Sequence, residues 1–280
     1  MAPTATIYAI SDLHLERRQN REALEQMASH PNDWLILAGD VCDSVGLFEW
    51  TLDLLTPRWR QVVWVPGNHE LWTTSKQDLR GEAKYRRLVE ACRNAGVLTP
   101  EDPYPVFDVP GARARIAPLF LLYDYSFGPA GMPPEAVKAW ALEQDIVCTD
   151  EYLLFPDPYP SRQAWCAARC ELTSRRLAEV SGAEPLILVN HFPLRRDLAD
   201  LPLVPRFVPW CGTRRTEDWH LRFGAAVVVT GHLHIRSTSW RDGVRFEEVS
   251  LGYPRQWRAE QRLEQYLRRI WPMPSPPRPP

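Results

Sequence analysis

Residues 34–43 read WLILAGDVCD, and this stretch decides the fold class. Its apolar run, Trp34 to Ala38, ends at Gly39 and Asp40. Short apolar runs bounded by turn residues are typical of strands buried in an α/β sheet. In such sheets, ligands bind at the carboxyl ends of the strands. The stretch therefore predicts a buried strand that presents Asp40 at a functional edge.

The same pattern, an apolar run followed by polar residues, occurs four more times along the chain. The runs are Ile7 to Ile10, Val62 to Val65, Leu186 to Val189 and Ala225 to Val229. The polar groups after them are Asp12-Leu13-His14, Gly67-Asn68-His69-Glu70, Asn190-His191 and Gly231-His232-Leu233-His234. If the runs are strands of an α/β fold, their carboxyl ends bring all these side chains to one rim.

Histidine is concentrated at these predicted strand ends. Five of the seven histidines lie there, and we interpret the other two, His30 and His220, as ordinary helix or loop residues. A single Asp-x-His or Gly-Asp is a weak signal, because each occurs often by chance. Burying the whole set is costly, however, unless each polar group is paired or bound to metal. The joint pattern therefore predicts an N/O ligand set large enough for two metal ions.

The ordered set of motifs resembles that of the calcineurin-like metallophosphoesterases. The motifs are Asp-x-His, Gly-Asp-x-x-Asp, Gly-Asn-His-Glu, a further His and Gly-His-x-His, and they extend from Asp12 to His234. The resemblance implies an α/β fold in which two β-sheets pack together and are flanked by helices, an αββα sandwich. It covers neither residues 125–170 nor the C-terminal tail with any motif.

The resemblance also implies a ligand set for each of two divalent ions. It assigns Asp12, His14 and His234 to one ion and Asn68, His191 and His232 to the other, with Asp40 as the bridge between them. In an extended segment, residues two apart point the same way, so Asp12 and His14 can share an ion. His232 and His234 need a turn after Gly231 to reach different ions. Imidazole and carboxylate ligands without Cys suit Mn, Fe, Zn, Ni or Co.

Two such ions clamp the attacking and leaving oxygens of an in-line displacement at phosphorus, and a water held between them becomes the hydroxide nucleophile near neutral pH. The resemblance implies that His69 protonates the leaving oxygen and that Asp43 orients His69. The alternative for Asp43 is an N-cap of the helix that begins near Val45. We interpret Glu70 as a residue that supports the ligands rather than binding metal.

One position departs from the pattern of the protein phosphatases, which have Arg-Gly after the second Asp of the motif. This chain has Ser44 and Val45 there, which counts against protein-phosphatase activity. A cation for the phosphate must then come from elsewhere. The candidates are Arg195, Arg196, Arg206, Arg214 and Arg215.

We expect a single domain over residues 1–271, with irregular insertions at about 124–161 and 193–216. The Pro-rich residues 272–280 are expected to form a disordered tail. Each insertion is either an irregular surface segment or a cover over the site that selects the substrate. Their aromatic residues Trp140, Tyr152, Tyr159 and Trp210 are candidate substrate contacts.

Local patterns predict the other elements. Helices are expected over residues 20–29 (with Asn20 as N-cap), 45–55, 76–95 (stopped by Gly96), 135–144, 162–180 and 256–270. Strands are expected near Val106 and over 115–122, and residues 237–240 and 244–250 should form a hairpin.

Composition and charge exclude several classes. The 280 residues are 45% hydrophobic and 24% charged, which is ordinary for a globular protein. The net charge of -2 gives no basic footprint for nucleic acid. The sequence shows no signal peptide and no apolar run long enough for a membrane span. Its six Cys form no Cys-x-x-Cys pair, so we expect a reduced, cytoplasmic protein.

The function predicted from these observations is hydrolysis of a phosphate ester, most simply a small-molecule phosphomonoester. The alternative is a phosphodiesterase that acts on a cyclic nucleotide or another diester. A non-catalytic scaffold of the same fold is a third reading, disfavoured because every ligand and acid position is retained. Nucleic acid and membrane partners are not expected, and the sequence leaves the oligomeric state open.

Overall fold

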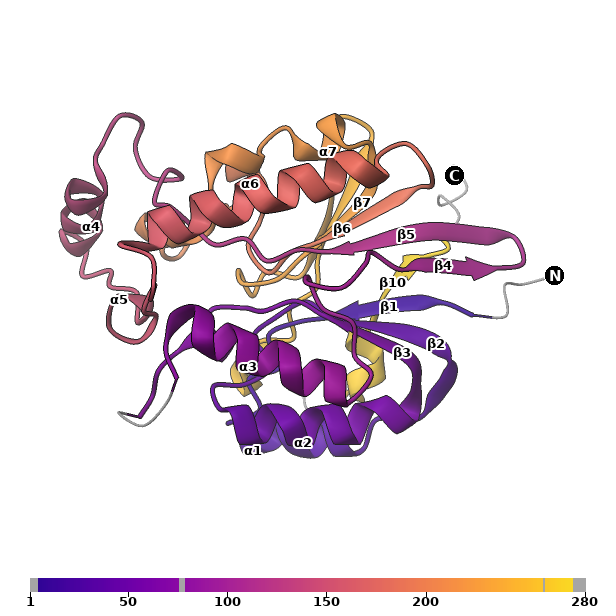
Figure 1. The fold of residues 1–280 in the computed structure, drawn as a ribbon. Coiled ribbons are helices and arrows are strands. Elements are labelled where there is room, and N and C mark those ends of the chain that lie inside the picture. Colours follow the sequence, from indigo (N-terminus) through magenta and orange to yellow (C-terminus); the bar gives the residue numbers. More distant parts are fainter. Residues whose placement is uncertain (1–4, 76–78, 259, 274–280) are drawn as a thin grey trace, which may run out of the picture.

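The computed structural model describes residues 5–75, 79–258 and 260–273, which form two facing β-sheets (Figure 1). The first sheet has the strand order β10-β1-β2-β3 and the second the order β4-β5-β6-β7-β9-β8. The first comprises β1 (Ile7–Ile10), β2 (His30–Leu37), β3 (Trp59–Trp64) and β10 (Arg268–Trp271). The second comprises β4 (Val106–Val109), β5 (Ala112–Pro118), β6 (Leu186–Val189), β7 (Ala225–Thr230), β8 (Ser237–Arg241) and β9 (Val244–Glu248).

Helices cover the outer face of each sheet (Figure 1). Below the first sheet in that view lie α1 (Arg18–Glu25), α2 (Val45–Leu55) and α3 (Gly81–Asn94). Above the second lie α6 (Arg162–Val180) and α7 (Trp219–Arg222). The short α4 (Pro134–Leu142) and α5 (Asp150–Leu153) project at the end away from the chain termini. Single 3₁₀ turns occupy Thr56–Arg58, His69–Leu71, Arg196–Leu198, Pro205–Trp210, Arg214–Thr216, Pro254–Gln256 and Leu263–Tyr266.

Side-chain alternation along the strands creates the sandwich. In β2, Ile36 belongs to the core between the sheets, whereas Leu35 and Leu37 belong to the core that includes Phe48 of α2. Successive side chains of a strand point to opposite faces, so a strand that is apolar at every position needs cover on both sides. A second sheet on one face and helices on the other supply that cover, and the predicted αββα architecture is confirmed.

Most predicted elements are confirmed. Helices α2 and α6 have the predicted bounds, and all five apolar runs form strands. The predicted hairpin is β8 and β9, which pair antiparallel around Asp242 and Gly243. Helix α4 lies within one residue of its predicted start.

Two predictions near the chain ends are wrong. Asn20 does not cap a helix, because α1 begins at Arg18 and the buried amide of Asn20 instead donates to the carbonyl oxygens of Leu13 and Gly252. The helix expected over residues 256–270 is replaced by 3₁₀ turns and strand β10, which pairs antiparallel with β1. Without β10, the edge of β1 would leave unpaired backbone groups.

Two further boundaries differ from the prediction. The strand expected over residues 115–122 ends at Pro118, and the buried chain that follows turns toward the site, where the Leu121 N–H donates to Asn190 Oδ1. Helix α3 begins at Gly81 rather than at 76; residues 76–78 lie outside the described part of the chain.

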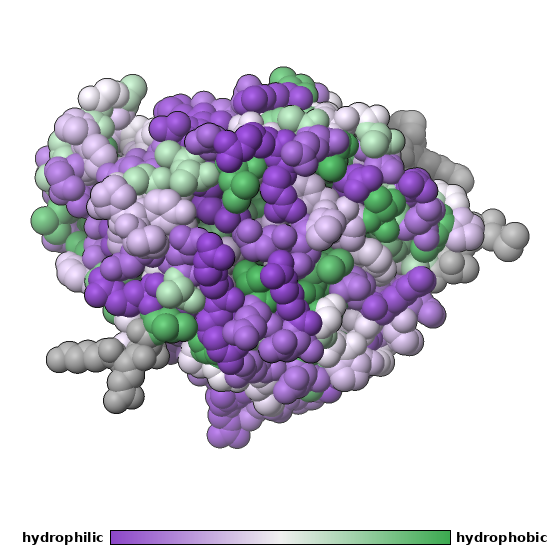
Figure 2. Space-filling view, in the orientation of Figure 1, coloured by the Kyte–Doolittle hydropathy of each residue, from purple (hydrophilic) through white to green (hydrophobic). Residues whose placement is uncertain are grey.

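The surface agrees with an ordinary globular chain. The face seen in Figure 2 is mainly hydrophilic, with hydrophobic residues in small groups. Within residues 5–75, 79–258 and 260–273, no helix is long and apolar enough to cross a membrane. The single domain and its Pro-rich tail stay predictions, since 274–280 lie outside the described residues.

Candidate metal centre

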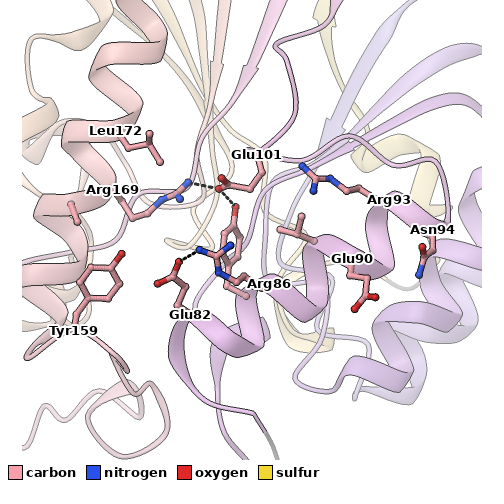
Figure 3. Close-up of a pocket in the computed structure, with 12 residues that line it drawn as sticks. Glu82, Arg86, Glu90, Arg93, Asn94, Glu101, Tyr159, Arg169 and Leu172 are labelled. Atoms are coloured by element: carbon pink, nitrogen blue, oxygen red, sulfur yellow. Dashed lines mark hydrogen bonds and ion pairs between the residues drawn. The ribbon is translucent and has the colours of Figure 1, made fainter.

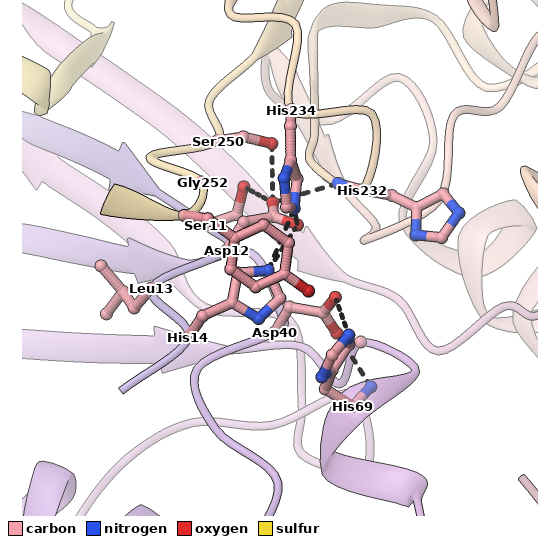
Figure 4. A network of polar contacts seen from close by, with 12 residues as sticks. Ser11, Asp12, Leu13, His14, Asp40, His69, His232, His234, Ser250 and Gly252 are labelled. Atoms are coloured by element: carbon pink, nitrogen blue, oxygen red, sulfur yellow. Dashed lines mark hydrogen bonds and ion pairs between the residues drawn. The ribbon is translucent and has the colours of Figure 1, made fainter. Parts of the chain in front are cut away.

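The loops that follow five parallel strands bring the predicted ligands close to one another, and Figure 4 shows Asp12, His14, Asp40, His232 and His234 among them. The first sheet contributes residues from the ends of β1, β2 and β3, and the second contributes residues from the ends of β6 and β7. Three groups of side chains come close enough to hold a cation between their ligand atoms. They are Asp12, His14 and His234; His14, Asp40 and His69; and Asp40, His191 and His232.

The first group joins the loop after β1 to the loop after β7. The Nε2 atom of His234 lies 3.0 Å from Asp12 Oδ1 and 3.0 Å from His14 Nε2. All three side chains thus direct a ligand atom at a common point, as the resemblance implied for one ion.

The other two groups both contain Asp40. Its Oδ2 atom lies 3.3 Å from His191 Nε2 and 3.8 Å from His69 Nε2, while its Oδ1 accepts from the His69 backbone N–H at 3.0 Å. One of these groups adds His14 and His69 to Asp40, and the other adds His191 and His232. Asp40 therefore links His14, a member of the first group, to His191 and His232, which is the position that a bridging carboxylate needs.

The ligand loops are not extended, contrary to the geometry that we assumed for Asp12 and His14. Both have a left-handed backbone, with φ of 54° and 42°. Asp40, His232 and His234 also have positive φ. Non-glycine residues in this region store strain, and such residues cluster at functional sites. The expected turn is present: His232 (φ 73°) and His234 (φ 54°) direct their rings into different groups.

The glycines of the motifs make room for the ligands. A Cβ on Gly67 would lie 2.0 Å from Asp40 Oδ1, and one on Gly231 would lie 2.4 Å from Asp12 Oδ2. Any larger residue at either position would displace a carboxylate of the centre. The Gly in Gly-Asn-His-Glu and in Gly-His-x-His is therefore explained by close approach to a ligand.

The donor set fits divalent cations. Among the described residues, four buried atoms of the predicted ligands have no hydrogen-bond partner: Asn68 Oδ1 and His232 Nε2, and also Asp12 Oδ1 and His191 Nε2, which form ion pairs only with other predicted ligands. Buried polar atoms are normally paired, so orphans at one point indicate a missing partner. Hydrogen bonds on the opposite edge of the ring hold two of the imidazoles in place. His191 Nδ1 donates to the Ala38 carbonyl oxygen and His234 Nδ1 to Gln256 Oε1, which leaves each Nε2 free for metal.

Asp12 is held in the same way. Its Oδ2 accepts from the hydroxyls of Ser11 and Ser250, at 2.5 and 2.7 Å, and from the His232 backbone N–H at 3.0 Å (Figure 4). These bonds turn Oδ1 toward His14 and His234. Neither serine was identified from the sequence, because a lone Ser after a strand carries no signal.

The carboxylates give the centre a strong negative field. Burial alone would lower the pKa of His191, but Asp40 and Asp12 raise it to about 10. Burial and the neighbouring His191 lower the pKa of His232 to about 3. A field that favours a proton on one imidazole equally favours a bound cation, which would leave both rings neutral as ligands.

His69 and Asp43 form the predicted pair. The Nδ1–H of His69 donates to Asp43 Oδ1 at 2.7 Å. Burial would lower the pKa of His69, but Asp40 and Asp43 raise it to about 9, so that it carries a proton at neutral pH. The alternative role of Asp43 as a helix cap does not hold, since Ser44 caps α2 by accepting from the Leu47 N–H.

Glu70 holds the loops together and belongs to none of the three groups of potential metal ligands. Its buried carboxylate accepts from the backbone N–H groups of Asp40, Val41 and Gly67 at 2.9 to 3.0 Å. It therefore ties the loop after β2 to the loop after β3.

Three neighbours of the centre were missed from the sequence. Asp150 accepts from the side-chain amide of Asn68 at 2.9 Å, and Trp72 packs on the His69 ring with centroids 3.6 Å apart. Tyr253 stacks on His14 with centroids 4.4 Å apart. Trp72, two positions after Glu70, was the only one close in sequence to a motif. The other two come from segments without any recognisable pattern.

The predicted substrate contacts lie elsewhere. Trp210 is buried and donates its indole N–H to Glu151, away from the ligand groups. Arg195 forms ion pairs with Asp197 and Asp242. The other candidate arginines also bond to nearby carboxylates or backbone carbonyl oxygens. Those others are Arg196, Arg206, Arg214 and Arg215. This placement gives no support to these residues as substrate contacts.

A cavity of about 220 Å³ opens over the ligand groups. Both predicted insertions reach it, the first through Val147, Cys148 and Asp150 and the second through Phe207. A larger cavity of about 580 Å³ lies between α3 and α6 (Figure 3), but most of its charged groups pair locally, as Arg169 does with Glu101. The candidate metal centre therefore has the smaller cavity, and within the described part of the chain the groups of potential metal ligands all lie there.

Comparison with known proteins identifies the class. The model of the calcineurin-like phosphoesterase family matches residues 5–236, so the chain belongs to this family. The predicted family and fold are thereby confirmed, and the chain is a metal-dependent phosphoester hydrolase rather than a non-catalytic scaffold.

One relative matches this chain both in sequence and in structure. The chain is 50% identical over 274 residues to the acyl-carrier-protein phosphodiesterase PptH of Mycobacterium tuberculosis, covering 96% of this chain and 84% of the relative. The crystal structure of the phosphopantetheinyl hydrolase PptH from that organism matches with a TM-score of 0.91 and 48% identity, covering 98% of each chain. The activity of this relative agrees with the predicted alternative, a phosphodiesterase, better than with a phosphomonoesterase.

Proposed function

We propose that the protein hydrolyses the phosphodiester that joins a phosphopantetheinyl arm to an acyl carrier protein. The observation that supports this substrate is the match to PptH over 98% of both chains, which includes the two insertions as well as the ligand loops. Insertions that build the rim of a site commonly carry specificity. On this proposal, the substrate is bound to a protein, whereas the sequence had led us to expect a free small molecule.

We further propose that two divalent ions occupy the centre. Asp12, His14 and His234 would hold one, Asn68, His191 and His232 would hold the other, and Asp40 would contact both. The imidazole and carboxylate donors suit Mn, Fe, Zn, Ni or Co. When bound, such a pair activates water and neutralises charge on the phosphoryl oxygens.

The chain's own residues would complete the reaction. The proton on His69 Nε2 would pass to the ester oxygen that leaves with the carrier protein, while Asp43 holds the ring at Nδ1. Water adds to phosphorus and the bond to the carrier-protein oxygen breaks, which yields phosphopantetheine and a free hydroxyl on the carrier. The cavity bounded by Val147 and Phe207 has a volume of only about 220 Å³, far too small for a folded domain, so the carrier protein would remain outside and only its arm would enter.

A direct assay tests the proposal. Purified protein with added Mn²⁺ is incubated with acyl carrier protein bearing its phosphopantetheinyl arm, and intact-protein mass spectrometry follows loss of the arm. Nitrophenyl phosphate and bis-nitrophenyl phosphate serve as monoester and diester comparisons. Cleavage of the carrier protein and of the diester, with Asp40→Ala inactive on both, is the expected result. Turnover of the monoester alone would contradict the proposal.

A further inference from the structure

Asp150 connects the first insertion to the metal centre. It lies in α5, within residues 124–161, and its side chain is fully buried. Its Oδ1 atom accepts two hydrogen bonds, one from Asn68 Nδ2 at 2.9 Å and one from Trp72 Nε1 at 2.6 Å. One carboxylate oxygen of the insertion thus contacts both Asn68 and Trp72, which adjoin the predicted acid His69.

The hydrogen bond between Asp150 and Asn68 determines which side-chain atom of Asn68 faces the predicted cation. A side-chain amide presents oxygen on one side and nitrogen on the other, and only the oxygen can bind a cation. A carboxylate accepts hydrogen bonds, so it attracts the nitrogen of Asn68 and turns Oδ1 the opposite way. Asn68 Oδ1 is buried with no hydrogen-bond partner among the described residues, as a ligand atom directed at a cation would be.

The bond to Trp72 acts on the predicted acid. The indole ring packs on His69 with centroids 3.6 Å apart. Asp43 holds the His69 ring at Nδ1, and Trp72 supports its face. A Trp72 fixed through its indole N–H therefore restricts the direction in which His69 Nε2 points.

We propose that Asp150 is a positioning residue of the centre, which orients Asn68 for metal binding and Trp72 for support of His69. On this proposal, the insertion is part of the catalytic scaffold and not merely a cover. The inference rests on the proposed role of Asn68 as a metal ligand.

A merely structural role for Asp150 is the competing explanation, and the next residue is a matched control for it. Glu151 lies in the same short helix and accepts from Tyr125 and from Trp210, both at 2.7 to 2.9 Å. It also pairs with Arg162. Glu151 therefore anchors the insertion without contacting Asn68 or Trp72. Glu151→Gln should loosen α5 while leaving the centre oriented.

The test measures metal affinity directly. Metal-free wild type, Asp150→Ala, Asp150→Asn, Glu151→Gln and Asn68→Ala are titrated with Mn²⁺ by calorimetry, and circular dichroism confirms that each is folded. We expect Asp150→Ala to weaken one of the two Mn²⁺ sites by about 10–100-fold, the usual effect of removing a residue that orients a ligand. Asp150→Asn, which keeps one acceptor oxygen, should recover part of the loss. Glu151→Gln should bind both ions as wild type does.

The outcomes separate this inference from the proposed function. If Asn68→Ala weakens one site but Asp150→Ala does not, the positioning role is wrong and the ligand assignment stands. If Asp150→Ala and Glu151→Gln weaken binding equally, Asp150 acts only through the fold of the insertion, and the proposal is overturned. If Asn68→Ala leaves both sites unchanged, the ligand assignment itself is wrong, and this inference falls with it.

The Trp72 bond has its own test. Trp72→Phe keeps an aromatic ring beside His69 but removes the indole N–H that Asp150 accepts. We expect Mn²⁺ affinity to stay at the wild-type value while kcat on the diester falls and KM changes little. Unchanged kcat would remove Trp72 from the proposal.

Discussion

At the scale of single residues, the centre depends on very close packing around its ligands. Gly67 leaves space for Asp40, and Glu70 three residues later accepts from the backbone of both loops. The motif Gly67-Asn68-His69-Glu70 thus contains a predicted ligand, the space for the predicted ligand Asp40, and a carboxylate that anchors both loops. This explains why the motif residues are clustered in sequence although they perform different tasks.

Gly67→Ala should damage the centre selectively. Its Cβ would overlap Asp40 Oδ1, so the carboxylate must move away from His191. We expect Mn²⁺ affinity to fall about tenfold or more, as for other disturbances of ligand orientation. Calorimetric titration measures this. Gly46→Ala is the control, because nothing lies within 4 Å of its added Cβ, and equal effects of the two substitutions would contradict the explanation.

His69→Ala should separate proton transfer from metal binding. The protein should retain its metal, but turnover of an ester with a poor leaving group should fall about 10²–10⁴-fold, the typical contribution of a general acid. An ester of nitrophenol leaves without a proton and should lose much less. Steady-state kinetics on both esters measure the difference. Equal losses on both would assign His69 a positioning role instead.

At the scale of elements, the C-terminal strand shows where local pattern failed. Residues 256–270 resemble a helix in composition, yet Arg268–Trp271 pair with β1 and Ile270 enters the core between the sheets. A free edge on β1 would leave backbone groups unpaired, and the nearby end of the chain satisfies them. Tertiary pairing here overrides local propensity.

Ile270→Ala should therefore destabilise the whole fold. Ile270 is fully buried, and truncation of such a residue typically costs about 2–5 kcal/mol in the free energy of unfolding. Its exposed neighbour is the control: Arg269→Ala should change stability by less than about 0.5 kcal/mol. Denaturant melts of both variants test this. A small effect of Ile270→Ala would mean that β10 contributes little to the sandwich.

At the scale of the whole molecule, the centre joins the two sheets. Asp12, His14 and Asp40 come from the first sheet, whereas His191 and His232 come from the second. A cation bound by both sets should therefore link the sheets and stabilise the folded state, since the unfolded chain has no such site.

Metal removal should thus lower the melting temperature. One ion present at 100 times its Kd stabilises a protein by about 2.7 kcal/mol. For a chain of 280 residues, that corresponds to roughly 5 °C. Thermal melts with Mn²⁺ and with a chelator measure the shift. Asp40→Ala should show a much smaller difference, and an equal shift in that variant would place the stabilising metal elsewhere.

The sequence by itself determined the five buried strands and the convergence of the motif residues at the strand ends, and the family resemblance of those motifs implied the αββα sandwich. It could do so because apolar runs and strand-end motifs are local, and parallel strands align their carboxyl ends. Only the tertiary structure decided that β10 closes the first sheet, that Asp150 and Tyr253 adjoin the centre, and that Trp210 and the candidate arginines do not. These outcomes depend on contacts between segments far apart in the chain. No local pattern encodes such contacts, since they form only when the whole core packs.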